Sequence, residues 1–559
     1  MAAKRAEFEF NNEKICLVMP KHIDLERMLI SFYMLLKYDG RRPVTRMGRQ
    51  EITLQSLSDV LTSQHGDTLP GFAAHSNLVK DWLYSDLIDI VYRGKPDKER
   101  VTSPRPLHLN AYKLRNPRYL KDYRASEHLF SMIRSADPSL LKRLREYLGA
   151  GMDPNNEDAY DGESELDLDT LLIVRMVDNP KLKEQPAGEA VKLEAPLCDG
   201  QARLLCNDLR RLLVYKDRVP RPVLIEYLRM AFGLHLGLYL LRLFNQLSGW
   251  VDDGRASPTC RNCPVRPDQQ ENAFAACPYA FQHNGGTSPY RVTEIAVDMG
   301  SDAHSHMAEL ARTSCSSHYQ RMNDYVRAVF TTNLLMDFAN SYIGERLLGR
   351  RGQTVADAME LLGKSSVEMD VHFGQKIDEF FARRSEGDVE LREYDAIRRM
   401  DGLTPLEKLV ELVTLDRTRY YRRYLVDLID AAFMKGQDSG LMRQGKGKGN
   451  ERRWQMGSRL LEMLVQIAVL EPVGSDAALS FRSRPLLVDE FVRWLRDRYG
   501  IVLAPEWPGA TIQDYQAFNT NLGHLKERLR EIGFFTDLSD AYNAQTIRPR
   551  YTIEAEVMA

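Results

Sequence analysis

Residues 223–250 read VLIEYLRMAFGLHLGLYLLRLFNQLSGW and come closer than any other stretch to a continuous apolar run. A helix that is apolar all round belongs either to a large core or to a membrane span. Glu226, Arg229 and Arg242 interrupt this run, and no stretch offers about 20 uncharged apolar residues. We therefore predict a buried core helix and no membrane association.

Helical periodicity continues on both sides of this stretch. It extends over residues 201–244, 317–348, 355–362, 367–381 and 405–434. The last of these segments carries four arginines interleaved with three tyrosines: Arg417, Arg419, Tyr420, Tyr421, Arg422, Arg423 and Tyr424. Helix predominates in the middle of the chain, so the predicted fold class is mainly α.

Length and composition limit the possible classes of protein. A chain of 559 residues is too long for one core, so we expect a multidomain protein. Its formal net charge of -2 gives no overall basic excess, and nucleic-acid binding would need a local patch. The seven cysteines are an odd number and lie mostly singly, which is a poor disulfide framework. We expect a reducing, cytoplasmic location, and the first residues, MAAKRAEFEFNNEK, lack the apolar core of a secretory signal.

Composition shifts divide the chain into five parts: an N-terminal helical domain (1–150), an acidic loop and linker (151–199), a helical domain with the cysteines (200–350), a further helical region (351–440) and a basic arm with a C-terminal domain (441–559).

In the first part, a helix from residue 23 to 36 and shorter helices at 54–61 and 78–87 precede a strand at 88–92 that runs into a turn. Three helices and a hairpin suit a winged-helix-like module, and an ordinary helical domain with a surface hairpin is the alternative.

The sharpest local signal is Cys260-Arg261-Asn262-Cys263-Pro264, because two thiolates three positions apart can reach one tetrahedral ion at about 2.3 Å. Cys277 is the expected third ligand. The fourth is Cys315 or one of the histidines His283, His304, His306 and His318. We predict a closed structural zinc site formed by Cys260, Cys263, Cys277 and Cys315. An iron–sulfur cluster, suggested by the prolines after Cys263 and Cys277, and cysteines without metal are the alternatives.

Motifs for other chemistry are absent. The sequence contains no GxxxxGK[ST], GxGxxG after a strand, HExxH or GxSxG, so nothing indicates a small-molecule substrate or a complete catalytic centre. The protein is therefore expected not to be an enzyme. Scattered acidic pairs such as Glu368 with Asp370 leave a metal-dependent nuclease, with an acidic site assembled from distant residues, as an alternative.

The C-terminal part predicts three helices, at 459–470, 486–499 and 515–532, followed by a two-stranded return over residues 534–553. That order is typical of a winged helix-turn-helix, whose third helix can enter a DNA groove while the wing contacts the backbone. A basic arm precedes it. The candidate DNA contacts are Arg443, Lys446, Lys448, Arg452, Arg453, Asn521, His524, Lys526, Arg528, Arg548 and Arg550. A winged helix that binds only protein is the alternative.

Residues 525–534 (LKERLREIGF), 538–545 (LSDAYNAQ) and 547–551 (IRPRY) resemble uncharacterised subunits of bacterial anti-phage defence islands of the methylation-associated type. The resemblance covers the last fifth of the chain and carries over no functional residues. It implies a cytoplasmic subunit that works beside partners encoded elsewhere. We therefore expect a non-enzymatic, DNA-interacting scaffold subunit of a defence complex, held together by structural zinc, and a protein-only adaptor is a further alternative.

Overall fold

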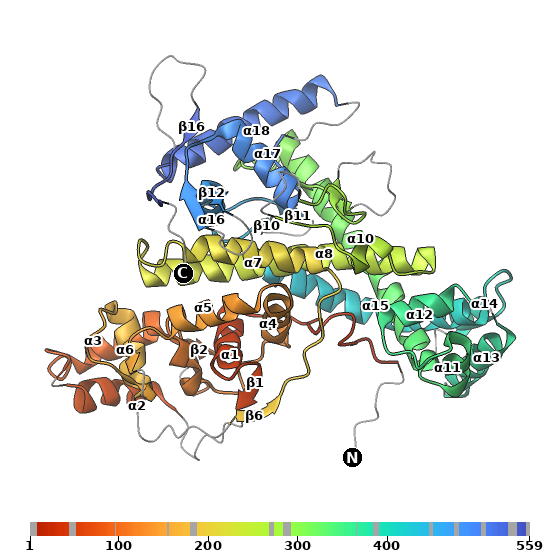
Figure 1. The fold of residues 1–559 in the computed structure, drawn as a ribbon, viewed down its shortest axis with the longest axis horizontal. Helices are drawn as coiled ribbons and strands as arrows, with labels where there is room; N and C mark the ends of the chain where they lie inside the picture. Colours follow the sequence, from red (N-terminus) through yellow and green to blue (C-terminus); the bar gives the residue numbers. More distant parts are fainter. Residues whose placement is uncertain are drawn as a thin grey trace.

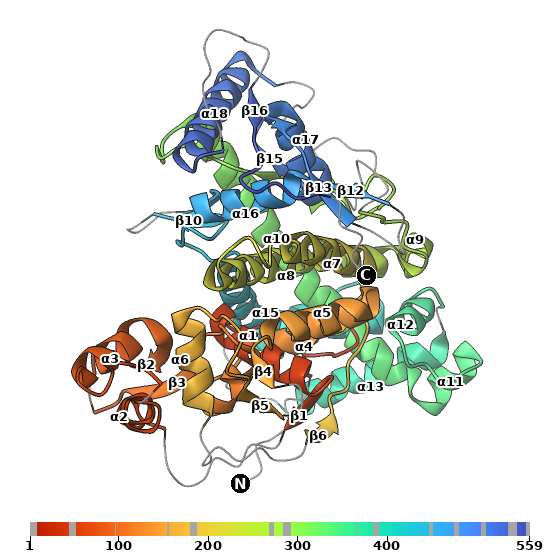
Figure 2. The ribbon, with the colours of Figure 1, turned by 60° about the vertical axis from the view of Figure 1, so that its left-hand side comes forward.

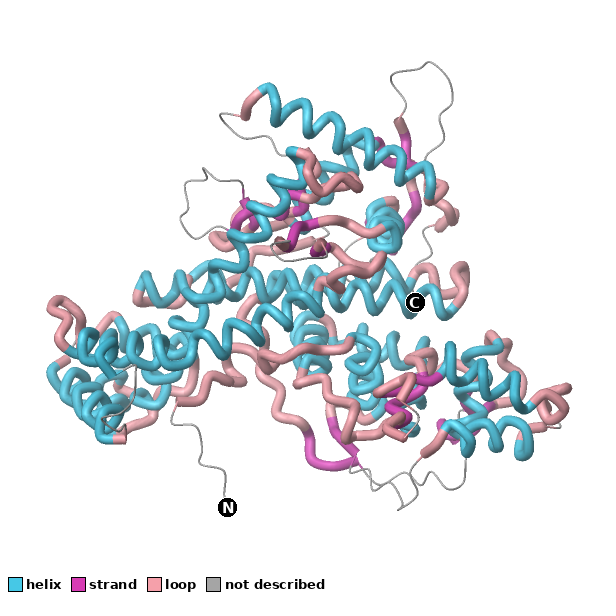
Figure 3. The backbone as a smooth tube through the Cα atoms, turned by 180° about the vertical axis from the view of Figure 1, so that it is seen from behind, coloured by secondary structure: helices cyan, strands magenta, loops and turns pink. Residues whose placement is uncertain are grey.

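The computed structural model describes residues 8–43, 52–66, 68–95, 97–153, 156–178, 187–267, 273–282, 292–364, 366–383, 391–445, 451–474, 480–504, 510–534 and 545–554. Helices make up most of this part of the chain, and strands occur as short pairs (Figure 3). The expectation of a mainly α protein is confirmed.

Long helices form the middle of the molecule (Figure 1). They are α7 (Asp199–Leu213), α8 (Arg221–Asp253), α10 (His306–Ala339) and α15 (Pro405–Ala432). Helix α8 begins with Pro222 in its first turn, which suits that position because proline lacks the N–H that would go unpaired there. It ends at Gly254, whose φ of 62° is left-handed.

Helix α8 is long and apolar enough to cross a membrane by length and composition, but 83% of its most apolar 18-residue window is buried inside the protein. The prediction of a buried core helix is confirmed. Of its interrupting charges, Glu226 and Arg229 pair with each other at 2.6 Å, and Arg242 is 1% exposed. The apolar run therefore serves a core shared by the surrounding helices.

The N-terminal part lies on one side of α7 and α8 (Figures 1 and 2). Its elements are α1 (Leu25–Lys37), β1 (Arg41–Pro43), α2 (Leu54–Asp59), α3 (Ser76–Trp82), β2 (Ile88–Val91), β3 (Arg100–Pro104), α4 (Ala125–Ala136), α5 (Pro138–Leu148), β4 (Met152–Asp153), β5 (Asn156–Tyr160), α6 (Leu168–Val177) and β6 (Ala187–Ala190). The predicted three helices and the hairpin of β2 with β3 are present. The winged-helix interpretation of them stays a prediction.

The remaining elements of the middle follow in two groups. Around the cysteines lie α9 (Pro258–Arg261), β7 (Phe281–Gln282), β8 (Val292–Thr293) and β9 (Ile295–Ala296). Beyond α10 follow α11 (Tyr342–Leu348), α12 (Val355–Leu362), α13 (Val367–Ala382) and α14 (Leu391–Arg398). Capping boxes fix the starts of α12 and α15, where Thr354 and Thr404 each accept from the backbone three residues on.

The C-terminal part lies on the opposite side of α8 from the N-terminal part (Figure 2). Its elements are β10 (Met442–Gln444), β11 (Arg452–Trp454), α16 (Ser458–Ala468), β12 (Leu470–Val473), β13 (Ser480–Ser483), β14 (Leu486–Leu487), α17 (Val488–Tyr499), β15 (Ile501–Val502), α18 (Ile512–Glu531) and β16 (Thr546–Ile547). The three predicted helices are confirmed as α16, α17 and α18.

The strands of this part pair differently from the predicted return. Among the described residues, β16 pairs with β14, which precedes α17, and a hairpin of β12 with β13 lies between the first and second helices. Strand β15 runs parallel to the distant β9. Residues 535–544, where the first strand of a wing would lie, are outside the described residues. The structure therefore shows the three helices, and it does not show a winged helix.

Candidate metal and nucleic-acid sites

Four cysteines gather where α7, α8 and the loop after α9 meet. Cys198 occupies the capping position before α7, and Cys260 lies on α9. A Cβ on Gly200 would lie 3.2 Å from the sulfur of Cys263, so that thiol lies against the first turn of α7. Burial raises the pKa of the Cys198 thiol to about 12, with Arg242 opposing the rise and Cys277 and Cys263 adding to it. Burial also raises the pKa of the Cys260 thiol, and the thiols of Cys198, Cys263 and Cys277 add to the rise. All four thiols are therefore close enough for their charges to interact.

Cys315 lies in a different environment. It is 1% exposed on α10, and after burial the groups that shift its pKa are Arg452 and Asp430. Its predicted partners Cys260, Cys263 and Cys277 are not among them. The sequence thus indicated Cys260, Cys263 and Cys277. In the structure, the fourth cysteine near them is Cys198.

The candidate histidine ligands also lie apart from the group where they are described. His318 is 2% exposed between the rings of Phe281 and Trp454, and burial lowers its pKa to about 3. His306 bonds Asp514 at 2.6 Å, and His304 is exposed. His283 falls outside the described residues. No three His, Cys, Asp or Glu side chains in the described ranges stand together as ready-made metal ligands.

A buried chain of hydrogen bonds leads away from the cysteines through α7, α8 and α17. Arg242 Nη1 donates to Gln201 Oε1 at 2.6 Å, and Gln201 Nε2 lies 2.8 Å from His235 Nδ1. His235 Nε2 lies 2.9 Å from Asp208, which also accepts from Tyr499 at 2.6 Å and from Arg498. Burial alone would raise the pKa of Asp208, but Arg498 and the bonds from His235 and Tyr499 bring it below its ordinary value. The C-terminal helix α17 is thereby fastened to the core.

Five of the predicted DNA contacts have partners inside the protein. Arg452 bonds both oxygens of Asp430 at 2.8 Å, Arg453 lies 3.6 Å from Asp298, and Arg550 pairs with Glu462. Arg528 donates to the carbonyl of Met456 at 2.9 Å. Asn521 is 1% exposed and bonds the backbone of Val297, Met299 and Leu503, which ties α18 to the strands β9 and β15. Asn521 serves the fold in this position.

The other contacts remain at the surface or lie outside the described residues. Arg443 and Arg548 are exposed, and His524 and Lys526 are half-buried. Lys446 and Lys448 fall outside the described residues. Arg443, Lys526 and Arg548 are joined to no carboxylate within the described ranges. Among the predicted contacts, these three are the cations most available to a partner.

The hairpin β10–β11 and helix α18 come together around one carboxylate. Asp298 is 1% exposed, and Gln455, next to β11, forms a bridge with it. Burial raises the pKa of Asp298, and a backbone bond from Gly300 and the charges of Arg453, His524 and Arg528 oppose that rise. A Cβ on Gly300 would lie 2.9 Å from the ring of His524, so glycine is needed for this close approach. The basic arm and the third helix, separated in sequence, thus both bring positive charge to Asp298.

Helix α15 carries a second exposed basic row to which the sequence analysis gave no role. Arg419, Arg422 and Arg423 are exposed close together on this helix, and none pairs with a carboxylate among the described residues. The ammonium of Lys21 lies 3.2 Å from the ring centre of Tyr424. The interleaving of arginine and tyrosine at helical spacing was the signal for this row.

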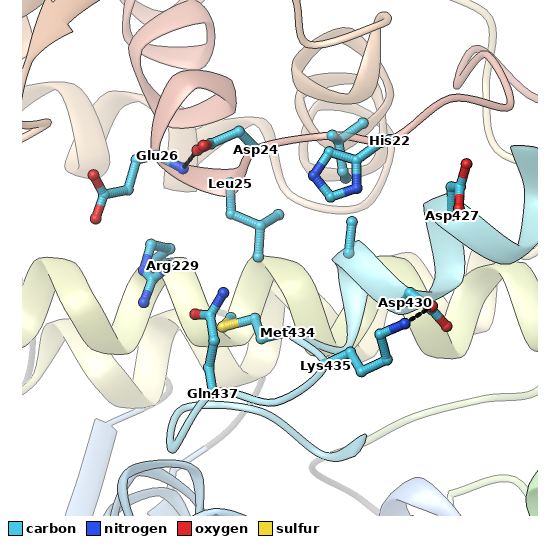
Figure 4. A pocket seen from close by; sticks show the side chains of 12 residues that line it. His22, Asp24, Leu25, Glu26, Arg229, Asp427, Asp430, Met434, Lys435 and Gln437 are labelled. Atoms are coloured by element: carbon cyan, nitrogen blue, oxygen red, sulfur yellow. Dashed lines mark hydrogen bonds and ion pairs between the residues drawn. The ribbon is translucent and has the colours of Figure 1, made fainter. Parts of the chain in front are cut away.

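A cavity of about 440 Å³ lies between the start of α1, helix α8 and the end of α15 (Figure 4). Its lining includes several charged groups, but many of them have structural partners. Asp24 caps α1 by accepting from the backbone of Glu26 at 2.9 Å, and Asp430 binds Lys435 and Arg452. The cavity shows no arrangement that assigns it a reaction.

The described residues thus form a large helical protein, in which a buried helix is flanked by an N-terminal and a C-terminal part, with a cysteine group packed against the core and basic residues at the surface. The model of one protein family, Methylation-associated defense system protein MAD7, matches residues 5–551. The chain therefore belongs to this family and is a component of a methylation-associated defence system. The resemblance noted in the last fifth extends over nearly the whole chain. No curated protein and no solved structure matches it.

Proposed function

We propose that this chain is a non-enzymatic, DNA-interacting accessory subunit of a bacterial methylation-associated defence complex, active in the cytoplasm beside other subunits of the system. Membership of the MAD7 family supports the defence role and the presence of partner subunits. The DNA contact is the part of the proposal that rests on the surface where the hairpin β10–β11 meets α18.

The observation that carries the DNA contact is the charge imbalance around Asp298. One buried carboxylate faces Arg453 and Arg528, and Arg443 on the same hairpin is exposed without a carboxylate partner among the described residues. Lys526 adds a cation on α18, and Arg548 adds one beside Phe534, whose carbonyl accepts from the Arg548 backbone at 3.1 Å. Surface cations without partners can neutralise phosphates and release counterions, which favours binding. This surface is therefore suited to a DNA backbone.

The test measures binding of duplex DNA to the full chain at several salt concentrations. A variant with Arg443→Ala, Lys526→Ala and Arg548→Ala loses three candidate phosphate contacts. Each contact contributes about 0.9 to the slope of log K against log salt, so we expect the slope to fall by up to about 2.7. Affinity at low salt should fall with it, on every DNA sequence alike, because phosphate contacts carry no sequence information.

The matched control is Arg419→Ala, Arg422→Ala and Arg423→Ala on α15, which removes the same charge from a different surface. The control should retain the wild-type slope. Equal losses in both variants would show a general charge effect, and a loss in the control alone would move the DNA surface to α15. Wild-type protein that binds no DNA but copurifies with a defence subunit would overturn the DNA contact in favour of a protein-only adaptor.

A further inference from the structure

The cysteine group lies on elements that the rest of the fold holds in place. Arg203 of α7 donates to the carbonyls of Cys263 and Val265 at 3.2 and 3.1 Å, so the loop after α9 is fastened to α7. Cys198 stands at the start of that same helix, and Gly200 leaves room for the sulfur of Cys263. Cys263 of the loop and Cys198 at the start of the helix are thus brought together without any contribution from Cys315.

Arg242 gives an independent sign that an anion belongs beside these cysteines. Its side chain is 1% exposed, and its Nε has no hydrogen-bond partner. The guanidinium lies 3.6 Å from the ring centre of Phe274, donates to Gln201 and bonds Cys198. No carboxylate among the described residues forms an ion pair with it. A buried charge without a counter-charge is strongly unfavourable.

Metal-bound thiolates would supply the missing negative charge. Four thiolates around one Zn²⁺ carry a net double negative charge, and an iron–sulfur cluster held by four cysteines is also anionic. Neutral thiols would leave the guanidinium uncompensated. Arg242 would then act as the outer-shell cation that such a centre commonly has.

We infer that Cys198, Cys260, Cys263 and Cys277 together ligate one thiophilic metal centre, with Arg242 as its buried counter-charge. Zn–S bonds of about 2.3 Å place the sulfurs of a tetrahedral site about 3.8 Å apart. The four sulfurs do not stand at ligand spacing in the described ranges, so binding requires them to turn inward. Rotation about the single side-chain torsion of cysteine moves each sulfur, and metal binding stabilises the new arrangement.

The test uses the untagged full-length chain, with zinc and iron measured per chain and an absorbance spectrum recorded. One zinc per chain without visible absorbance supports a zinc centre, and iron with broad visible absorbance supports a cluster of the same four cysteines. Cys198→Ser should lose most of the metal, and Cys315→Ser should retain it. Arg242→Met should weaken the affinity for added zinc by about 10- to 100-fold.

A measurement on the wild-type protein covers the case in which Cys198→Ser does not fold. Thiols are alkylated with and without a chelator and are then located by mass spectrometry. Cys198, Cys260, Cys263 and Cys277 should become labelled together on chelation, whereas labelling of Cys206 should not follow theirs. Three results would each overturn the inference. The first is folded protein that contains neither zinc nor iron, and the second is equal labelling of Cys198 with and without the chelator. The third is loss of metal from Cys315→Ser but not from Cys198→Ser.

Discussion

Replacing Asp208 by asparagine should strongly destabilise the junction between the C-terminal part and the core. Asp208 is fully buried, and its carboxylate is the counter-charge of Arg498, which is 4% exposed. Asparagine has nearly the same shape but no charge, so Arg498 would remain buried without an ion-pair partner. Removing one partner of a buried pair costs about 3–5 kcal/mol. The amide group of asparagine would also face the donors of His235 and Tyr499, which now bond the carboxylate.

Urea unfolding followed by tryptophan fluorescence measures this loss, because the ring of Trp494 lies 5.3 Å from that of Tyr499. With a slope of about 3 kcal/mol per molar urea, a loss of about 4 kcal/mol moves the midpoint by more than about 1 M. Asp217→Asn, at an exposed position just after α7, is the control and should change stability by less than about 0.5 kcal/mol. Equal midpoints for Asp208→Asn and wild type would refute the role given to the ion pair.

Further predictions concern buried histidines and two glycines. Burial lowers the pKa of His108, His128 and His318 to about 3 each, below the unfolded value of about 6.5. Only the unfolded chain then takes up these protons as pH falls from about 6.5 to 3, so the stability present above pH 6.5 should decline by up to about 1.4 kcal/mol per histidine and pH unit. Equal urea midpoints at pH 7 and 5 would contradict this. Gly374→Ala in α13, where a Cβ meets no atom within 4 Å, should raise stability by about 0.5–1 kcal/mol. Gly500→Ala should lower stability by more than about 1 kcal/mol, because φ is +72° and the Cβ would collide with Phe281, and thermal melts compare the two.

The helices could be predicted from the sequence because their signals are local. Residues 355–362 were expected to be helical, and α12 spans Val355–Leu362 between the cap Thr354 and Gly363. The second C-terminal helix ends at Tyr499, where Gly500 takes a left-handed conformation. Apolar spacing, a capping side chain and a terminal glycine lie within a few residues of one another, so each helix carries its own boundaries.

The strand pairing could not be predicted in the same way. Strand β15 pairs with β9, about 200 residues earlier, and each contributes two residues. Strand β14 pairs with β16 across the whole of α17 and α18. A pair of two-residue strands has no recognisable period, and its partner is chosen by tertiary packing. The expected return after the third helix was therefore assigned to neighbouring residues.

The candidate sites show the same difference between what local sequence predicts and what tertiary packing decides. Composition located the basic residues, but it did not indicate that Arg452 would meet Asp430 or that Arg550 would meet Glu462. Spacing along the loop indicated Cys260 and Cys263. Cys198 lies 62 positions before Cys260, with α7 and α8 between them in the sequence, so only the packing of α7 against the loop places it beside Cys260 and Cys263.

The charges that interrupt the apolar stretch of α8 now have distinct explanations. Arg229 pairs with Glu226 on its own helix, whereas Arg242 has its hydrogen bonds with Gln201 and Cys198. From Gln201 the bonds continue through His235 and Asp208 to Arg498 of α17. A hydrogen-bond chain in a low-dielectric interior is costly to break at any one point. One buried chain of hydrogen bonds therefore holds both the cysteine group and helix α17 to α8. A substitution at Arg242 or at Arg498 is expected to disturb the hydrogen bonds that position the residue at the opposite end of this chain.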